Sequence, residues 1–527
     1  MRFFVYLLSI ALTILSLIAA LSISAYWWIA FVILGAGAVL GSWDLFQRHH
    51  NLLRNYPLSA HIRWVFEYIR PELRQYLFES DQDGKPFPRD QRALIYQRAK
   101  NVNDNRPFGT ELDVYGDGYE WINHSVAAHP EAKEGFRINI GGEQCAKPYS
   151  ASVYNISAMS FGALSANAIR ALNRGAKLGN FAHDTGEGGL SRYHRENGGD
   201  LIWEIGSGYF GCRQKDGTFD PELFKEQAQT DQVKMVEIKL SQGAKPGHGG
   251  VLPAAKVTRE ISEVRGVPTG QDCVSPSAHS SFSNPTGLLE FVQQLRELSG
   301  GKPAGFKLCI GHPLEFMAIV KAMLETQILP DFIVVDGAEG GTGAAPHELT
   351  DHVGTPLREG LIFARNVLTG AGLRDKIRIG ASGKVTSGFG LASNLALGAD
   401  WCNAARGFMF AVGCVQSRTC HTGRCPTGVA TQDPHRQKAI VVPDKAQRVA
   451  NFHHHTVMAL AEMVAAAGLD HPTDLTPAHL CRRTDLNVIQ TAEAFYEFLQ
   501  PGQLVDGGDT PLQHYWKAAD PSRFAIA

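Results

Sequence analysis

The sequence lacks an excess of basic residues. Its 50 lysines and arginines face 52 aspartates and glutamates, so the formal net charge is −2. Phosphate backbones are bound by surplus positive charge, and this balance therefore argues against nucleic acid as a partner. We also recognise no strand–glycine–helix fingerprint of a dinucleotide site, so a nicotinamide cofactor would have to be handled by a separate subunit.

Paired cysteines are lacking as well. The count of nine is odd, and six of the cysteines are scattered along the chain, at positions 145, 212, 273, 309, 402 and 481. This pattern excludes the disulfide framework of a secreted protein and indicates a reducing compartment.

The remaining three cysteines, Cys414, Cys420 and Cys425, lie within twelve residues, and Pro426 follows the last of them. Thiolates are the ligands that iron–sulfur clusters prefer, and Cys-Pro recurs at the end of their ligand runs. Three ligands at C-x5-C-x4-C spacing favour a three-iron cluster over a four-iron one. A zinc site with His421 as a fourth ligand and a set of reduced structural thiols are the alternatives.

Charge is missing altogether from Phe3 to Trp43. The run has two apolar halves, 3–21 and 26–40, each near the lower limit for crossing a bilayer. Tyr26-Trp27-Trp28 is typical of a membrane interface, and arginines flank both ends of the run. We predict a transmembrane hairpin over residues 1–43 that anchors the chain in the inner or cell membrane, with the catalytic part in the cytoplasm. A cleaved signal peptide is the alternative.

The segments on either side of the central region are more polar. Residues 44–150 are predicted to form an adapter, in which 62–70 is a basic amphipathic helix that either lies on the anionic leaflet or packs on the following domain. Residues 436–527 are predicted to form a C-terminal helical extension and tail, with a helix over 445–467. His453–His455 point in different directions around that helix, so we predict a polar surface there and no metal site.

The region 151–435 alternates short apolar runs with helical segments. This alternation predicts an α/β fold, a (β/α)8 TIM-type barrel, with a doubly wound sheet as the alternative. The candidate strands are 152–156, 181–183, 236–240, 272–275, 305–310, 332–335, 377–379 and 400–404. Glycine-rich segments follow several of them. Because the loops after barrel strands meet at one face, we expect the active site at that face.

These glycine-rich segments and the cysteine run, taken in order, resemble the FMN-binding synthase domain of glutamate synthase. The motifs are Ser157–Ser165, Thr185–Gly189, Gln242–Gly250, Gly340–Gly343, Gly372–Asp375 and Cys420–Gln432. The chain length and the apolar N-terminus are most similar to the stand-alone glutamate synthase large subunit-like proteins. The resemblance implies a barrel that carries FMN and a 3Fe-4S cluster. It also implies an oxidoreductase that reductively aminates 2-oxoglutarate to L-glutamate.

The resemblance also assigns roles to single residues. Cys414, Cys420 and Cys425 match the cluster ligands. Glu187 and Lys307 would be catalytic, the first near ammonia and the keto acid, the second facing flavin and substrate. The residues implied to hold FMN are Ala158, Met159, Ser160, Gln242, Lys307, Gly341, Gly383 and Arg406.

Three segments depart from the family pattern. The sequence Asn403–Arg406 replaces a glycine-rich phosphate loop, with Arg406 as a substitute contact. Ala338-Glu339 stands where His-Asp is usual, and Cys309–Pro313 follows the strand of Lys307. These departures leave two alternatives open, a related enzyme acting on another small keto or amino acid and a non-catalytic electron relay tethered to the membrane.

The resemblance implies partners too. The nitrogen would come from ammonia, or from glutamine through a separate amidotransferase, because we expect no glutaminase domain in this chain. Electrons would come from a donor such as ferredoxin or an NAD(P)H-oxidising subunit.

Overall fold

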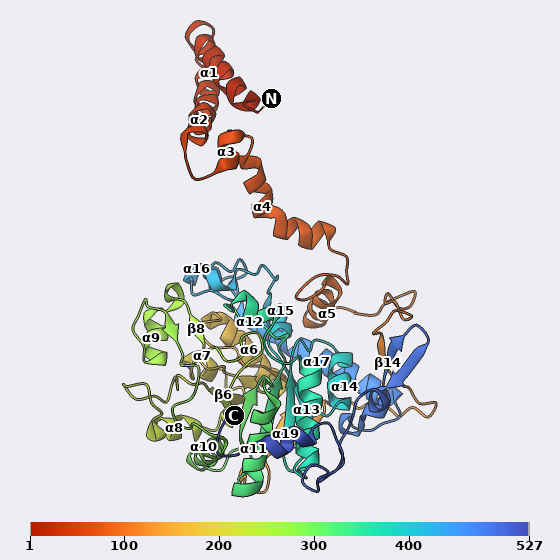
Figure 1. Ribbon diagram of the computed structural model, residues 1–527. Helices are drawn as coiled ribbons and strands as arrows, with labels where there is room; N and C mark the ends of the chain where they lie inside the picture. The colour runs from red at the N-terminus through yellow and green to blue at the C-terminus, as the bar shows by residue number, and fades with distance from the viewer. Residues whose placement is uncertain (1, 525–527) are drawn as a thin grey trace. The chain divides into compact units, whose positions relative to one another are not determined.

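The computed structural model describes residues 2–524 and divides into two compact units between Arg89 and Asp90. The first is helical throughout, and the second contains every β-strand of the described chain (Figure 1).

The N-terminal unit begins with two apolar helices, α1 (Phe4–Ser22) and α2 (Trp27–Phe46). Both are long and apolar enough to cross a membrane, by length and composition. The two helices pack against each other through small residues. Gly37 faces the Ser9 hydroxyl, and Gly41 faces the Tyr6 ring. The Tyr6 hydroxyl also lies 2.9 Å from Ser42 Oγ, so close packing and a polar contact hold the pair together.

Three short helical segments follow, namely α3 (Asn51–Asn55), α4 (His61–Leu73) and the π-helix η1 (Arg74–Phe78). The helix predicted over 62–70 is therefore confirmed as α4. None of its side chains is buried, and three exposed aromatic residues, Trp64, Phe66 and Tyr68, lie between Arg63 and Arg70.

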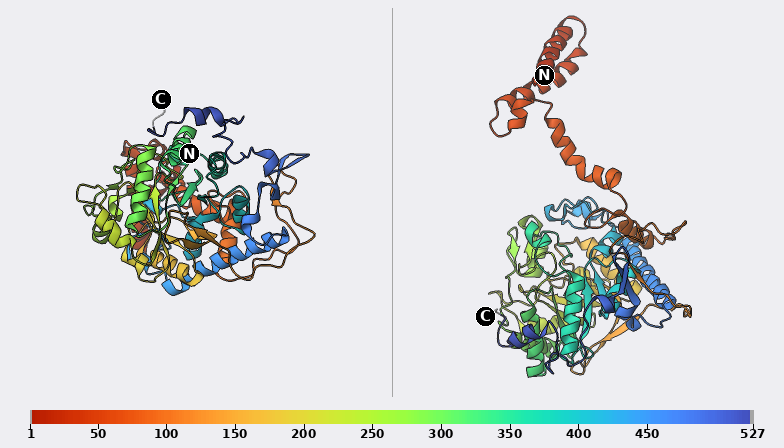
Figure 2. Two further views of the ribbon diagram at one scale, coloured as in Figure 1. Left: turned by 90° about the horizontal axis from the view of Figure 1, so that it is seen from below. Right: turned by 45° about the vertical axis from the view of Figure 1, so that its right-hand side comes forward.

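The second unit is built on a closed barrel of eight parallel strands, in the order β4-β5-β6-β7-β10-β11-β12-β13 (Figures 1 and 2). Their bounds are β4 Tyr154–Ile156, β5 His183–Asp184, β6 Leu201–Ile205, β7 Val233–Lys239, β10 Ala304–Leu308, β11 Phe332–Asp336, β12 Arg378–Ser382 and β13 Trp401–Ala404. Closure between β13 and β4 confirms the predicted barrel and excludes the doubly wound sheet.

One strand prediction is wrong. The segment 272–275 contains β9 (Cys273–Val274), which pairs with β8 (Val251–Leu252) in a separate two-stranded sheet outside the barrel. The third barrel strand is β6, which was not among the predicted strands. Trp203 stacks on Phe224 of α8 (Pro221–Ala228), with ring centroids 5.1 Å apart, so the neighbouring Glu204 points into the barrel.

Helices surround the strands, and several begin at a capping side chain. Ser165 accepts a hydrogen bond from Ala168 N at the start of α6, and Asn284 does the same for Gly287 N in α10. The helices of eight or more residues that follow the strands are α6 Ala166–Gly179, α8 Pro221–Ala228, α10 Pro285–Leu298, α11 Pro313–Thr326, α13 Leu357–Gly370 and α14 Gly388–Ala396. Shorter helices are α7 Arg192–Arg195, α9 Arg259–Arg265, α12 His347–Asp351, α15 Arg406–Val412 and α16 Pro434–Gln437.

Elements outside the barrel frame it. Helix α5 (Arg89–Ala99) precedes it, and two small sheets consist of β2 (Arg137–Ile140) with β3 (Tyr149–Ser152) and of β1 (Glu120–Ile122) with β14 (Leu480–Asp485) and β15 (Val488–Thr491). The chain ends with the short helices α18 (Ala492–Phe495) and α19 (Gln513–Ala518).

The long C-terminal helix α17 (Val442–Ala466) confirms the helix predicted over 445–467. The predicted polar surface is wrong for His453, which is buried. Its ring stacks on Phe181 with centroids 3.9 Å apart, and its Nε2 lies 2.9 Å from Ser152 Oγ. Burial lowers the pKa of His453 to about 3, so this histidine is a neutral packing residue between helix and barrel.

The letters Gly-x-Gly-x-x-Gly do occur once after a strand, at Gly206–Gly211, immediately behind β6. No helix begins there. The segment runs through turns, and the next helix is α8, starting at Pro221. A dinucleotide fingerprint needs its third glycine at the start of a helix, so this segment is not one.

Candidate active site

One cavity lies where the loops after the barrel strands meet. Its walls come from the loops after β4, β5, β7, β11 and β13 and from the cysteine segment. Eight residues predicted from the sequence line it, namely Ala158, Met159, Ser160, Glu187, Gln242, Gly341, Arg406 and Cys420. The predicted residues outside its lining are Lys307, Gly383, Cys414 and Cys425.

Glu187 is held tightly in the loop after β5. One of its oxygens, Oε1, lies 2.9 Å from Lys239 Nζ at the end of β7. Two glycines pack against the carboxylate. An ideal Cβ would lie 2.2 Å from Glu187 Oε1 if built on Gly250, and 2.8 Å from Oε2 if built on Gly206. The carboxylate therefore occupies a slot that only glycine neighbours leave open.

Burial alone would raise the pKa of Glu187, but the opposing charges of Lys239, Arg265 and Lys245 hold it below the ordinary value. Glu187 is therefore a carboxylate at neutral pH.

The loops after β4 and β5 touch through their backbones. Gly186 has a φ of +65°, and a Cβ there would lie 2.7 Å from Ser160 N and 3.0 Å from Met159 N. Only glycine fits a left-handed conformation against a neighbouring main chain. This contact fixes the Met159–Ser160 segment beside Glu187.

Cations form most of the charged wall. They are the buried Lys239, Lys245, Lys256 and Arg265 and the half-buried Arg406. Of these five, only Arg406 was predicted from the sequence. Lys245 lies inside the motif Gln242–Gly250, which was the available sequence signal. Lys256 and Arg265 reach the cavity from the excursion that runs from β8 to the end of α9, and sequence spacing does not locate that excursion.

Three of the four buried cations are held by backbone oxygens. Lys245 Nζ donates to Gly249 O (3.2 Å), and Lys256 Nζ donates to Ala163 O (3.2 Å). Arg265 donates to Phe161 O (3.3 Å), while its Nε is buried without a hydrogen-bond partner. A buried guanidinium nitrogen without an acceptor is a position where an anionic ligand gains a charge-assisted bond.

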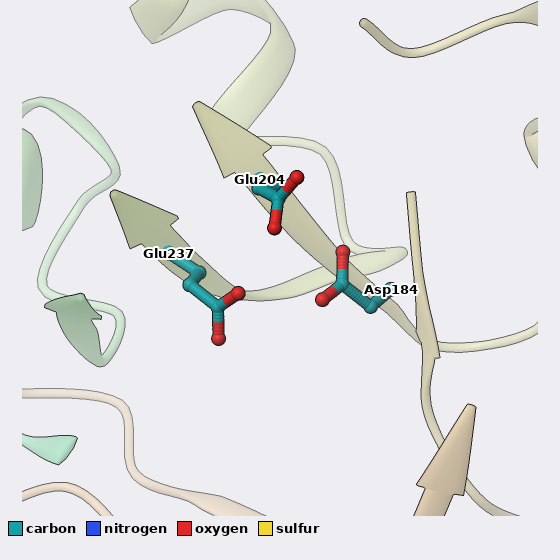
Figure 3. A group of neighbouring side chains, drawn as sticks. All are labelled: Asp184, Glu204 and Glu237. Carbon is teal, nitrogen blue, oxygen red and sulfur yellow. The ribbon is translucent and has the colours of Figure 1, made fainter. Parts of the chain in front are cut away.

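Lys307 lies inside the barrel and not on the cavity wall. Its Nζ contacts Glu204, in β6, and lies 3.2 Å from Glu237 Oε1, in β7. Asp184, at the end of β5, completes a group of three buried acids that point toward one another (Figure 3). Of these three, only Glu204 lines the cavity. In the sequence, Glu204 and Glu237 each stand within an apolar run. A charged residue in such a run indicates a buried charge with a partner, and this was the sequence signal for the group.

Gly383 follows β12, and an ideal Cβ there would lie 3.1 Å from Leu357 and 3.4 Å from the carboxyl carbon of Glu339. Glu339 in turn accepts a hydrogen bond from Leu357 N at 2.8 Å, at the start of α13. The structure thus places an acidic group beside Gly383.

The three clustered cysteines carry no disulfide. Cys425 is buried, and burial would raise its pKa, but the Thr427 hydroxyl and the backbone N–H groups of Ala430, Thr427 and Val429 lower it. Burial raises the pKa of the Cys414 thiol to about 11, with Arg406 opposing. Helix α5 supports the same loop, because the Tyr96 hydroxyl donates to Cys414 O at 2.6 Å.

Among residues 2–524, Asp184, Glu204 and Glu237 each place one donor atom within 4.8 Å of the other two, as the binding of a single ion requires. The three clustered cysteines do not meet this spacing. A tetrahedral zinc ion needs its sulfur donors about 4 Å apart. The spacing of the trio therefore disfavours one zinc ion.

The sequence match settles the family. A profile described as the conserved region in glutamate synthase matches residues 126–470, more than half of the chain. This chain belongs to the glutamate synthase family. The predicted resemblance is thereby confirmed.

Comparisons with individual proteins indicate the same family for this glutamate synthase family member. It is 37% identical over 521 residues to the glutamate synthase large subunit-like protein YerD of Bacillus subtilis, covering 89% of this chain and 98% of YerD. The archaeal glutamate synthase (NADPH) of Methanocaldococcus jannaschii is 36% identical over 316 residues, which cover 60% of this chain and 59% of that protein. The large subunit-like protein of Rhizobium meliloti is 28% identical over 412 residues, covering 73% of this chain and 88% of that protein.

Solved structures are more distant. Flavocytochrome b2 with sulfite bound has a TM-score of 0.42 and 12% identity, covering 84% of this chain and 90% of that chain. The assignment of the barrel rests on its own strand pairing.

Proposed function

We propose that this chain is a membrane-anchored, FMN- and iron–sulfur-dependent glutamate synthase that forms L-glutamate from 2-oxoglutarate and ammonia. One observation carries the proposal. Glu187, the buried cations and Cys420 line a single cavity at the loop face of the barrel. Membership of the glutamate synthase family supports the same reaction.

The residues of the cavity fit FMN. The segment Ala158–Ser160 and the neighbouring Gly186 line the cavity and would lie against a flat ring, and Gln242 lies in the same wall. Arg406 reaches the Gly341 segment, where its guanidinium donates to Thr342 O at 3.0 Å, and would bind the phosphate. The phosphate contact predicted for Gly383 stays a prediction, and the nearby Glu339 carboxyl counts against it.

The cysteine segment fits an iron–sulfur cluster. Three free thiols, one of them facing backbone N–H groups, are the donor set and environment that such clusters take. We propose Cys414, Cys420 and Cys425 as ligands of a 3Fe-4S cluster. When both groups are bound, the cluster supplies single electrons and FMN supplies the hydride.

The chain's own side chains bind and orient the reactants. Lys245, Lys256 and Arg265 present positive charge to a dicarboxylate such as 2-oxoglutarate. Glu187, kept ionised by Lys239, accepts hydrogen bonds from ammonium and holds the nitrogen beside the keto carbon. Lys307 does not line the cavity, but its Nζ contacts Glu204, which does. The direct contact between Lys307 and the flavin therefore stays a prediction.

We further propose that α1 and α2 anchor the chain in the inner or cell membrane, with the barrel in the cytoplasm. The apolar side chains of both helices are mostly exposed, as lipid-facing residues are. A helix of 19 residues, such as α1, spans about 28 Å, close to the hydrocarbon thickness. The chain would receive electrons from ferredoxin or from an NAD(P)H-oxidising subunit.

The test uses the full chain purified anaerobically in detergent. Flavin, iron and acid-labile sulfide are quantified, and the protein is then given dithionite, ammonium and 2-oxoglutarate. We expect glutamate to form. We also expect Glu187→Gln to abolish turnover while flavin and iron are retained, and Glu263→Gln, at an exposed glutamate of α9, to leave turnover unchanged. A fully loaded protein that forms no glutamate would overturn the proposal.

Two of the three substituted loops give no support to the alternative functions. Glu339 accepts a hydrogen bond from Leu357 N, and His312 Nδ1 accepts one from Leu314 N at 3.4 Å at the start of α11. Neither side chain lines the cavity, so these two substitutions serve local helix capping. The third loop differs, because Ala405 and Arg406 line the cavity.

A further inference from the structure

Four charged side chains meet inside the barrel next to the cavity. Asp184, Glu204, Glu237 and Lys307 come from β5, β6, β7 and β10 and are 1%, 2%, 1% and 3% exposed. Strand pairing explains the meeting, because Glu204 lies directly opposite Glu237 in the register of β6 and β7. We call these four residues the interior acid cluster.

The ammonium of Lys307 already occupies the position between the acids. It contacts Glu204 and lies 3.2 Å from Glu237 Oε1. One oxygen from each of the three acids lies within 4.8 Å of the others. Figure 3 shows the three acids pointing toward one another. One positive charge balances one carboxylate, and an unbalanced buried charge is costly. The other two acids are therefore expected to hold protons, and a metal ion would have to displace the lysine.

Glu237 is the member best placed to exchange its proton. Apart from the ion pair with Lys307, neither of its oxygens has a hydrogen-bond partner. Glu204 is the member that both contacts Lys307 and lines the cavity. The three side chains thus form a continuous path from the barrel interior to the cavity wall.

We infer that Glu237 stores a proton that it exchanges with the cavity through Lys307 and Glu204. The acid form of Glu237 gives a proton to the lysine nitrogen as that nitrogen releases another to the Glu204 carboxylate. Glu204 would then give it to the nitrogen of the imine that 2-oxoglutarate and ammonia form, when that imine is reduced to the amine, and solvent re-protonates the cluster. The delivery step rests on the proposed function, whereas the storage does not.

The electrostatics agree with this geometry. Burial raises the pKa of Glu237 to about 7, Lys307 opposes the rise, and Glu204 adds to it. Burial raises the pKa of Asp184 well above its ordinary value, and the other two acids add to that rise. The groups that face Glu237 are Glu204, Lys307 and Asp184, while Asp336 on β11 faces Lys307.

Storage is tested by infrared spectroscopy of the full-length protein without substrate. We expect a carbonyl band of a protonated carboxylic acid, part of which disappears as the pH rises through about 7. The titrating part should be absent from Glu237→Gln and unchanged in Glu263→Gln, while the part due to Asp184 remains. A wild-type spectrum with no titrating band between pH 5 and pH 8, or a titrating band that survives in Glu237→Gln, would overturn storage.

The connection to the cavity is tested by transfer into deuterium oxide at pH 5. The Glu237 band of the wild type should shift, and the shift should be at least about tenfold slower in Glu204→Gln, because the path to the cavity is interrupted. Equal rates would overturn the path. Binding of Mg²⁺ or Mn²⁺ that Glu237→Gln abolishes would show a metal site in place of a proton store.

Delivery is tested by turnover. In a protein that forms glutamate, Glu237→Gln should lower kcat by about tenfold or more, while the KM for 2-oxoglutarate is retained. An unchanged kcat would overturn delivery. If the wild type forms no glutamate, the proposed function and this delivery step fail together, and the infrared measurements still decide storage and path.

Discussion

The slot around Glu187 gives the sharpest prediction. In Gly250→Ala, the new methyl group would lie 2.2 Å from Glu187 Oε1, where ordinary contacts are 3.4 Å or longer. The carboxylate therefore has to move by about 1 Å, and a displacement of that size costs about a hundredfold in rate. It cannot move away freely, because Gly206 packs on its other side and Lys239 holds it at 2.9 Å.

The assay is kcat for reductive amination of 2-oxoglutarate, with flavin fluorescence as the measure of FMN content. We expect a loss of about two orders of magnitude in kcat with FMN retained. Gly206→Ala should act in the same direction, because its methyl group would lie 2.8 Å from Glu187 Oε2. Gly311→Ala is the matched control, since its nearest neighbour, Glu315 Oε2, is 3.9 Å away. Wild-type kcat in Gly250→Ala would refute the positioning role of Glu187.

Further predictions concern other parts of the chain. Cys420→Ser should lose iron and sulfide while FMN stays bound, and retention of both would refute the ligand assignment. Lys245→Met should raise the KM for 2-oxoglutarate about tenfold or more, measured by initial rates, because a charge-assisted bond of about 1.5–3 kcal/mol is lost. Glu237 has a higher pKa in the folded chain, about 7, than its ordinary 4.5, so its contribution to the stability of the folded chain falls as the pH rises from 4.5 to 7. The thermal midpoint of Glu237→Gln, relative to wild type, should therefore rise over that range. Removal of residues 1–46 should move the protein from the membrane fraction to the soluble fraction.

The sequence predicted the barrel because short apolar runs alternate with helical segments, and several of these runs are followed by glycine-rich turns. It missed β6, and it wrongly assigned 272–275 to the barrel. The pairing of β9 with β8 outside the barrel depends on the tertiary fold, which sequence spacing does not show. A buried charge such as Glu204 is permitted when a distant residue, here Lys307, supplies its partner, and sequence spacing does not show that partner either.

The sequence also predicted part of the candidate site. Residues inside short glycine-rich motifs, such as Glu187 and Gln242, do line the cavity. Arg265 and Lys256 were missed because they come from a long excursion whose return to the cavity depends on the tertiary fold. Lys307 was predicted to face flavin and substrate, but its acidic partners lie on other strands and could only be found in three dimensions.

The bond from Tyr96 to Cys414 O has a practical meaning for anyone who expresses the barrel alone. Helix α5 precedes the first barrel strand by more than fifty residues, yet its tyrosine braces the loop that carries the thiols, and its ring also meets Phe410 edge-on at 6.0 Å. A fragment trimmed to begin at β4 would keep every strand and lose this brace. A water-soluble fragment should therefore begin before Arg89, so that it keeps α5 and the hydrogen bond from Tyr96 to the loop that carries the three cysteines.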